Sequence, residues 1–133
     1  MTRVTVRHAR REDAPTVARL FMMAWPLDSF LAMSPELTEE SFAEMVREYV
    51  AADGTLYSYA NTFVAEADGV VAGAICGYDG ARCRELKRPI LEDFARRFPD
   101  ANNSFGDYDE TEAGEFYLDS IGVDPSMRSL GIG

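Results

Sequence analysis

The start of the chain changes from the two-residue period of a strand to the longer period of a helix. Val4 and Val6 share one parity within residues 4–9, which is typical of a strand with one buried face. Pro15 then stands in an acidic first turn, and apolar residues follow at helical spacing as far as Trp25. We therefore expect a short strand and then a helix.

A loop and a second helix follow in the pattern. Pro26 and Pro35 bracket a segment with exposed apolar residues, which we expect to be a loop of the kind that often walls a site. Thr38 is suited to cap the next helix, whose apolar stripe ends at Asp53-Gly54. The stripe is more consistent with a packed core than with function.

The strongest hairpin signal lies in the middle of the chain. Residues 62–67 and 70–77 are two apolar runs joined by Asp68-Gly69, a dipeptide that favours tight hairpin turns. Tyr78 and Asp79 come directly after it. They could face a substrate, but a turn explains them better.

The remaining pattern contains a helix, a loop, a strand and a glycine-rich end. Apolar residues within 86–98 recur at helical spacing and predict a helix despite Pro89. Residues 99–111 are polar and acidic, as in a loop, and residues 115–123 form the next predicted strand. Residues 124–133 contain a turn that should open a helix absent from the sequence.

Composition and charge narrow the class of protein. The 133 residues are 47% hydrophobic, as in a globular domain, and their length suits one domain. The formal net charge of −10 opposes binding to a phosphate backbone, so we do not expect DNA or RNA as a partner. An acidic protein suits a cationic substrate such as an amine, although acidity also serves plain solubility.

The cysteines and the first residues carry no sign of a metal site or of export. Cys76 and Cys83 lie seven residues apart without a CxxC motif, and His8 is the one histidine, so we expect no metal site. Neither an apolar signal region nor a run of ~18 apolar residues occurs. We expect a cytoplasmic protein with reduced thiols and no membrane partner.

The end of the chain combines residues that suit an anion. Arg128, Gly131 and Gly133 follow a strand, and glycines let the backbone approach a ligand closely. Successive N–H groups ahead of a helix form an anion-binding nest. The alternative is an ordinary strand-to-helix turn, because glycine spacing alone is a weak signal.

Residues 121–133, IGVDPSMRSLGIG, resemble the acetyl-CoA-binding motif of the GNAT superfamily of N-acetyltransferases. The preceding order of elements, with Val71-Ala72-Gly73 in the third strand, is also similar to the N-terminal half of that family. The resemblance implies an α+β fold, with a mixed, mostly antiparallel sheet and flanking helices. It implies one domain over residues 1–133 that lacks the family's C-terminal part and carries an insertion at about residues 80–113.

The same resemblance implies acetyl-CoA as co-substrate. The backbone of Ile121, Gly122 and Val123 would pair with the pantetheine arm, unless these residues serve only the core. The pyrophosphate would bind the amides of a six-residue turn made of Arg128, Ser129, Leu130, Gly131, Ile132 and Gly133.

Transfer to an amine needs a base that removes the ammonium proton. Glu115 is the first candidate, because it lies thirteen residues before Arg128, the offset of the base in the superfamily's histone acetyltransferases. Asp119 and Tyr117 have the same parity as Glu115 and Ile121, so we expect one shared face, with Asp119 as a second base or amine anchor. An exposed strand-end carboxylate and a structural salt bridge are the alternatives for Glu115 and Asp119.

The resemblance thus implies an enzyme that transfers acetyl from acetyl-CoA to a primary amine of a small molecule or peptide, by direct attack in a ternary complex. The alternative is a non-catalytic module that binds CoA or a partner chain. The family's tyrosine acid would lie beyond Gly133. We therefore expect residues 1–133 alone to be inactive, and to form a homo-oligomer or be completed by a C-terminal segment.

Overall fold

The computed structural model describes residues 3–32, 34–99 and 116–125, with residues 116–120 described by their backbone alone. In this part of the chain a four-stranded antiparallel sheet has the order β1-β2-β3-β4. The strands are β1 (Val4–His8), β2 (Thr62–Ala67), β3 (Val70–Asp79) and β4 (Phe116–Val123). The predicted α+β architecture is confirmed.

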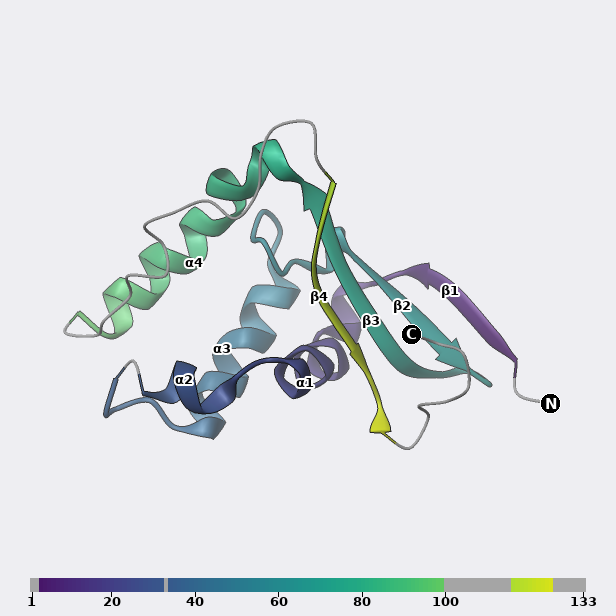
Figure 1. Cartoon of the computed structure of the whole chain (residues 1–133), viewed down its shortest axis with the longest axis horizontal. Helices are drawn as coiled ribbons and strands as arrows, with labels where there is room; N and C mark the ends of the chain where they lie inside the picture. Colours follow the sequence, from purple (N-terminus) through teal and green to yellow (C-terminus); the bar gives the residue numbers. More distant parts are fainter. Residues whose placement is uncertain (1–2, 33, 100–115, 126–133) are drawn as a thin grey trace.

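The described helices lie on one side of the sheet (Figure 1). They are α1 (Ala14–Ala24), α2 (Leu27–Leu31), α3 (Glu39–Ala51) and α4 (Cys83–Arg97), with short 3-10 turns η1 (Arg11–Asp13), η2 (Tyr59–Asn61) and η3 (Gly80–Arg82). The core lies between the sheet and the pair α1 and α3. Its largest fully buried side chains include Phe21, Leu20, Met45, Val46 and Val64.

Local chemistry accounts for the elements that the sequence predicted. The Thr38 side chain accepts the Ser41 N–H and caps α3, as expected. At the hairpin, Asp68 and Gly69 have φ angles of 52° and 85°, which a type I′ turn requires of both central residues. The hairpin of β2 and β3 is therefore confirmed.

Two predictions about loops are wrong. The segment after Pro26 contains α2, because Leu27, Phe30 and Leu31 pack against the core and stabilise a helix that proline-bracketed sequence alone does not predict. Tyr78-Asp79 is not a turn but the end of β3, since β4 supplies it with a partner strand.

α4 forms with Pro89 in its interior, as predicted. Proline removes a helical hydrogen bond and disturbs the carbonyls of the preceding turn. One carbonyl of that turn, that of Leu86, accepts the N–H of Leu56 at 2.9 Å. Residues 80–97 of the predicted insertion are η3 and α4, while residues 100–113 lie outside the described part of the chain.

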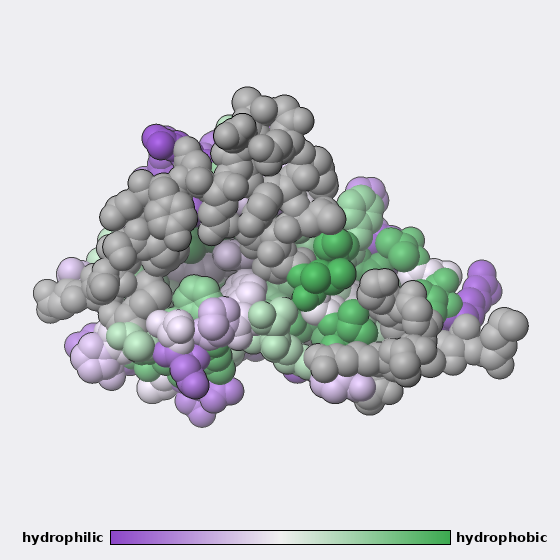
Figure 2. All heavy atoms as spheres, in the orientation of Figure 1, coloured by the Kyte–Doolittle hydropathy of each residue, from purple (hydrophilic) through white to green (hydrophobic). Residues whose placement is uncertain are grey.

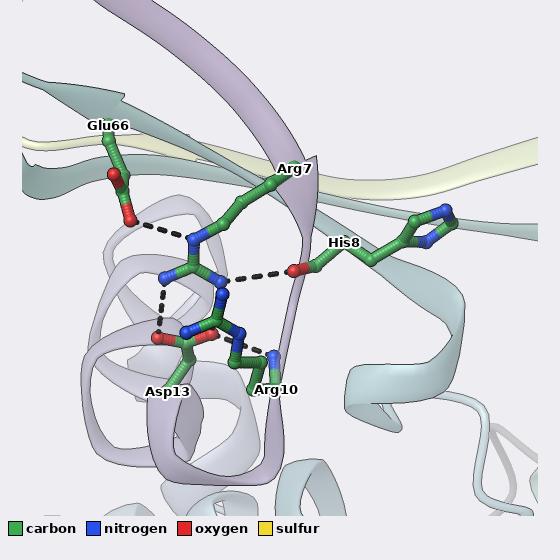
Figure 3. Close-up of polar contacts among 5 residues, drawn as sticks. All are labelled: Arg7, His8, Arg10, Asp13 and Glu66. Carbon is green, nitrogen blue, oxygen red and sulfur yellow. Dashed lines mark hydrogen bonds and ion pairs between the residues drawn. The ribbon is translucent and has the colours of Figure 1, made fainter.

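An ion-pair network fastens the edge strand β1 to the helical layer (Figure 3). The Arg7 guanidinium donates to Asp13 at 2.8 Å and to Glu66 at 2.7 Å, so one side chain joins β1, η1 and β2. The hydrogen bonds that Arg7 donates to Asp13 and Glu66 raise the Arg7 pKa. The hydrogen bond from Arg7 lowers the Asp13 pKa in turn, despite partial burial.

The opposite face of the sheet carries apolar side chains that the described residues leave exposed. Figure 2 shows hydrophobic surface gathered over the strands. These side chains are Val4, Val6, Phe63, Val70 and Ile121. Among the described helices, none is long and apolar enough to span a membrane.

Candidate cofactor site and active site

The C-terminal end of β4 is the described part of the predicted cofactor site. Val123 lies opposite Gly73 of β3, and the next N–H, that of Asp124, donates to the Ala72 carbonyl at 2.7 Å. In an antiparallel ladder, the N–H after one residue can donate to the C=O before its partner residue. The two partner residues then face each other without hydrogen bonding to each other. Val123 and Gly73 are therefore a non-hydrogen-bonded pair.

Hydrogen-bonded and non-hydrogen-bonded pairs alternate along the ladder, which fixes the direction of the backbone N–H and C=O groups in the preceding residues of β4. Gly122 and Ala74 form a hydrogen-bonded pair, whereas Ile121 and Ile75 form another non-hydrogen-bonded pair. The N–H and C=O of Ile121 therefore point away from β3, toward an edge of β4 where no described strand lies. The backbone groups of Gly122 point toward β3.

Gly122 lies directly against the backbone of α1. A Cβ atom at this position would lie 2.2 Å from the carbonyl oxygen of Leu20 and 2.8 Å from its carbonyl carbon. Both distances are shorter than any real contact of a Cβ, and a backbone carbonyl cannot swing aside as a side chain can. α1 and β4 can pack this closely only because residue 122 is glycine.

A second contact joins α1 to the residue after β4. The Arg19 guanidinium donates from Nη2 to Oδ2 of Asp124 at 3.4 Å. The Arg19 side chain is 53% exposed and that of Asp124 23% exposed. α1 therefore touches the end of the strand at two successive residues, Arg19 and Leu20.

An apolar hollow lies beside this strand end, on the exposed face of the sheet. Its volume is about 190 Å³, and its walls are apolar side chains and glycines of the four described strands, among them Val6, Phe63 and Ile121. The backbone edge at Ile121 thus borders an apolar surface rather than a charged one.

The N-terminal half of β4 contains a bulge. Leu118 lies opposite Gly77 and Ser120 opposite Cys76, so Asp119 is an extra residue without a partner in β3. A bulge interrupts the alternation of a strand and often re-aims a side chain.

The bulge breaks the parity that grouped the candidate catalytic residues. Tyr117 lies opposite Tyr78, a buried residue on the helical side of the sheet, whereas Ile121 is 52% exposed on the other face. The strict alternation on which the expected shared face of Tyr117 and Ile121 depends is therefore interrupted in the backbone at Asp119. Glu115 lies outside the described residues, and its role stays a prediction.

The predicted pyrophosphate turn, residues 128–133, also lies outside the described residues. The structure describes the residues that lead to this turn, namely the end of β4, Asp124 and Pro125. The sequence analysis did not predict the two contacts of α1 with these residues. No local signal could have found them, since Arg19 and Asp124 are 105 positions apart.

No protein-family model matches the chain, and no curated protein sequence matches it. Solved structures do. A crystal structure of an acetyltransferase is 31% identical, with a TM-score of 0.79 over 96% of this chain and 67% of that one. An N-acetyltransferase from Staphylococcus aureus Mu50 is 24% identical, with a TM-score of 0.70 over 96% of this chain and 69% of that one.

An agmatine N-acetyltransferase shares the fold more distantly, at 17% identity and a TM-score of 0.51 over 98% of this chain and 64% of that one. The 31% identical acetyltransferase, two thirds of which this chain covers, shows the family. The chain belongs to the GNAT superfamily of N-acetyltransferases.

Proposed function

We propose that this acetyltransferase moves the acetyl group of acetyl-CoA to a primary amine, by direct attack of the amine in a ternary complex. Acetyl-CoA is the standard acetyl donor of the family. The observation that carries the proposal is the outward-pointing backbone of Ile121, at an edge of β4 where no described strand lies, in the strand that leads to the predicted pyrophosphate turn.

The cofactor would bind as an added strand. The outward N–H and C=O of Ile121 suit pairing with the amides of a pantetheine arm, and Val123 has the same direction by alternation. Gly122 directs its own backbone groups to β3, so we assign it to the packing of α1 rather than to hydrogen bonding with the arm. The amides of residues 128–133 would bind the pyrophosphate.

The acceptor would be a cationic amine that loses a proton before attack. Glu115 is the proposed base, with Asp119 and Tyr117 as the next candidates, because a neutral nitrogen is required as nucleophile. The net charge of −10 supports a cationic acceptor. A small-molecule amine such as agmatine, the substrate named for one fold neighbour, is a reasonable first test compound.

The cofactor assignment is tested by calorimetry with acetyl-CoA on the wild type and on Gly131→Val. We expect the variant to lose binding, because the added side chain obstructs the approach of the ligand to the backbone. Far-UV circular dichroism of both proteins controls for folding. Unchanged affinity in a folded Gly131→Val protein would contradict the assignment.

The reaction is tested by following CoA release with a panel of amines. Glu115→Gln should lower the rate most near neutral pH and less at alkaline pH, where the amine deprotonates without help. Binding of acetyl-CoA without acetylation of any amine in the panel would favour the non-catalytic module. A parallel pH-rate profile would move the role of base from Glu115 to Asp119, to Tyr117 or to water.

We also propose a cytoplasmic location, which is supported by the two buried cysteines, Cys76 and Cys83, neither of which is in a disulfide.

A further inference from the structure

α1 contacts the end of β4 at two residues that face the same side of the strand. The Leu20 carbonyl lies over Gly122, and the Arg19 guanidinium reaches the carboxylate of Asp124. Residues 122 and 124 are two apart, so both contacts come from the helical side of the strand. Val123 lies between them.

Asp124 is held from β3 as well as from α1. Its N–H donates to the Ala72 carbonyl at 2.7 Å, while its side chain meets Arg19. The next residue, Pro125, has a restricted φ angle, so the direction of the chain beyond it depends on how Asp124 is placed. The predicted cofactor turn begins three positions after Pro125, at Arg128.

We propose that Arg19 is a positioning residue for acetyl-CoA. It acts through Asp124, which it holds in the orientation that directs the following turn toward the pyrophosphate. The proposal rests on the proposed function, since it assigns a second role at the same cofactor site. It differs from direct binding of a phosphate by Arg19, and the two possibilities predict opposite effects at Asp124.

The opposite effects follow from charge. Acetyl-CoA is an anion, so removing the carboxylate of Asp124 should strengthen binding if nearby charge alone matters. If Asp124 is instead the residue through which Arg19 positions the turn, the same change should weaken binding. Asp124→Asn therefore separates positioning from direct or long-range attraction.

The experiment is calorimetric titration of acetyl-CoA into the wild type, Arg19→Gln, Asp124→Asn and the double variant. We expect each single variant to raise Kd about threefold, the size that the loss of a partly exposed ion pair supports. The double variant should be no weaker than either single variant, because both remove the same contact. Arg19→Lys, which keeps a cation within reach of Asp124, should restore most of the affinity.

The control is Arg47→Gln. Arg47 is an exposed arginine of α3 that lines the same hollow of about 540 Å³ as Arg19, so its loss measures the effect of one positive charge without a contact to β4. We expect a Kd close to that of the wild type, with all variants melting within a few degrees of it.

Several results would overturn the proposal. Equal Kd values for the wild type and Arg19→Gln would contradict the positioning role of Arg19 without contradicting the proposed cofactor site. Tighter binding of acetyl-CoA by Asp124→Asn, or additive losses of affinity in the double variant, would contradict positioning. Either result would indicate that Arg19 attracts the anionic cofactor directly. A wild-type protein that does not bind acetyl-CoA would overturn the proposed function and the positioning role together.

Discussion

At Gly122 the absence of one side chain determines how closely a helix lies against a strand. The Leu20 carbonyl occupies the space in which a Cβ would stand. In this respect Gly122 differs from Gly54 and Gly69, which are needed for their positive φ angles and have open space around them. Gly122 lies inside the predicted cofactor motif, and its contact with Leu20 gives it a packing role there.

This difference predicts the effect of Gly122→Ala. We expect the free energy of unfolding to fall by about 3 kcal/mol, the upper end for an overpacked site, because a backbone carbonyl must move. Denaturant titration measures the loss. Gly54→Ala is the comparison, since it adds the same methyl group where only backbone strain of about 1 kcal/mol is expected. Equal stability of Gly122→Ala and the wild type would contradict the close contact.

At the scale of elements, a small group of polar contacts joins α4 to α3. The Tyr49 hydroxyl donates to the Asp93 carboxylate at 2.7 Å, and Arg97 donates to the same carboxylate at 2.9 Å and to Glu48 at 2.6 Å. Burial and the neighbouring Asp93 raise the Tyr49 pKa, so this hydroxyl stays a donor at neutral pH. Burial opposes ionisation of Asp93, but hydrogen bonds from Tyr49 and Arg97 outweigh it and lower the Asp93 pKa.

Tyr49→Phe should therefore loosen α4 more than the rest of the domain. We expect a loss of about 1–2 kcal/mol in the free energy of unfolding, the cost of removing one hydrogen bond to a charged group. Hydrogen exchange should be faster at the amides of residues 83–97 than in β2 and β3. Tyr59→Phe is the matched control, because its hydroxyl donates to Asp53 at 2.6 Å on the exposed surface. Uniform exchange across both regions would count against a separate role for the α4 contact.

At the scale of the whole molecule, Arg7 joins the edge of the sheet to the helical layer. Its side chain and those of Asp13 and Glu66 are all mostly buried, at 25%, 13% and 24% exposure. A shielded network of this kind contributes more than a surface pair, and removing one member leaves the other charges poorly compensated.

The network predicts a pH-dependent stability. The lowered Asp13 pKa means that its contribution is complete above the ordinary carboxyl pKa of 3.8 and is lost as the pH falls below that value. Asp13→Asn should therefore be less stable than the wild type by about 1–3 kcal/mol at pH 7, and this difference should shrink below about pH 4. Denaturant titrations at several pH values measure it.

Asp53→Asn provides the control for this prediction. Asp53 pairs with Arg11 at 3.4 Å, but the two side chains are 71% and 60% exposed, so the pair should contribute little at any pH. A stability difference for Asp13→Asn that stays constant from pH 7 to pH 3 would contradict the role of ionised Asp13.

Local sequence determined the elements whose stabilising contacts lie within a few residues. The cap at Thr38 and the Asp68-Gly69 turn depend on neighbours in the chain, and both were predicted. The motif in residues 121–133 is also local, and its residue types and spacing were sufficient to indicate the family. Short-range geometry leaves few alternatives at such positions, so a local pattern carries the necessary information.

Only the tertiary structure decided how distant segments complete the site. α2 forms through core packing, β3 extends past Gly77 because β4 pairs with it, and the bulge at Asp119 interrupts the alternation that grouped the candidate catalytic residues. The contacts of Arg19 and Leu20 with Asp124 and Gly122 likewise join positions about a hundred residues apart. Such contacts depend on the relative placement of whole elements, which burial and pairing across the fold determine and which no local pattern in the sequence records.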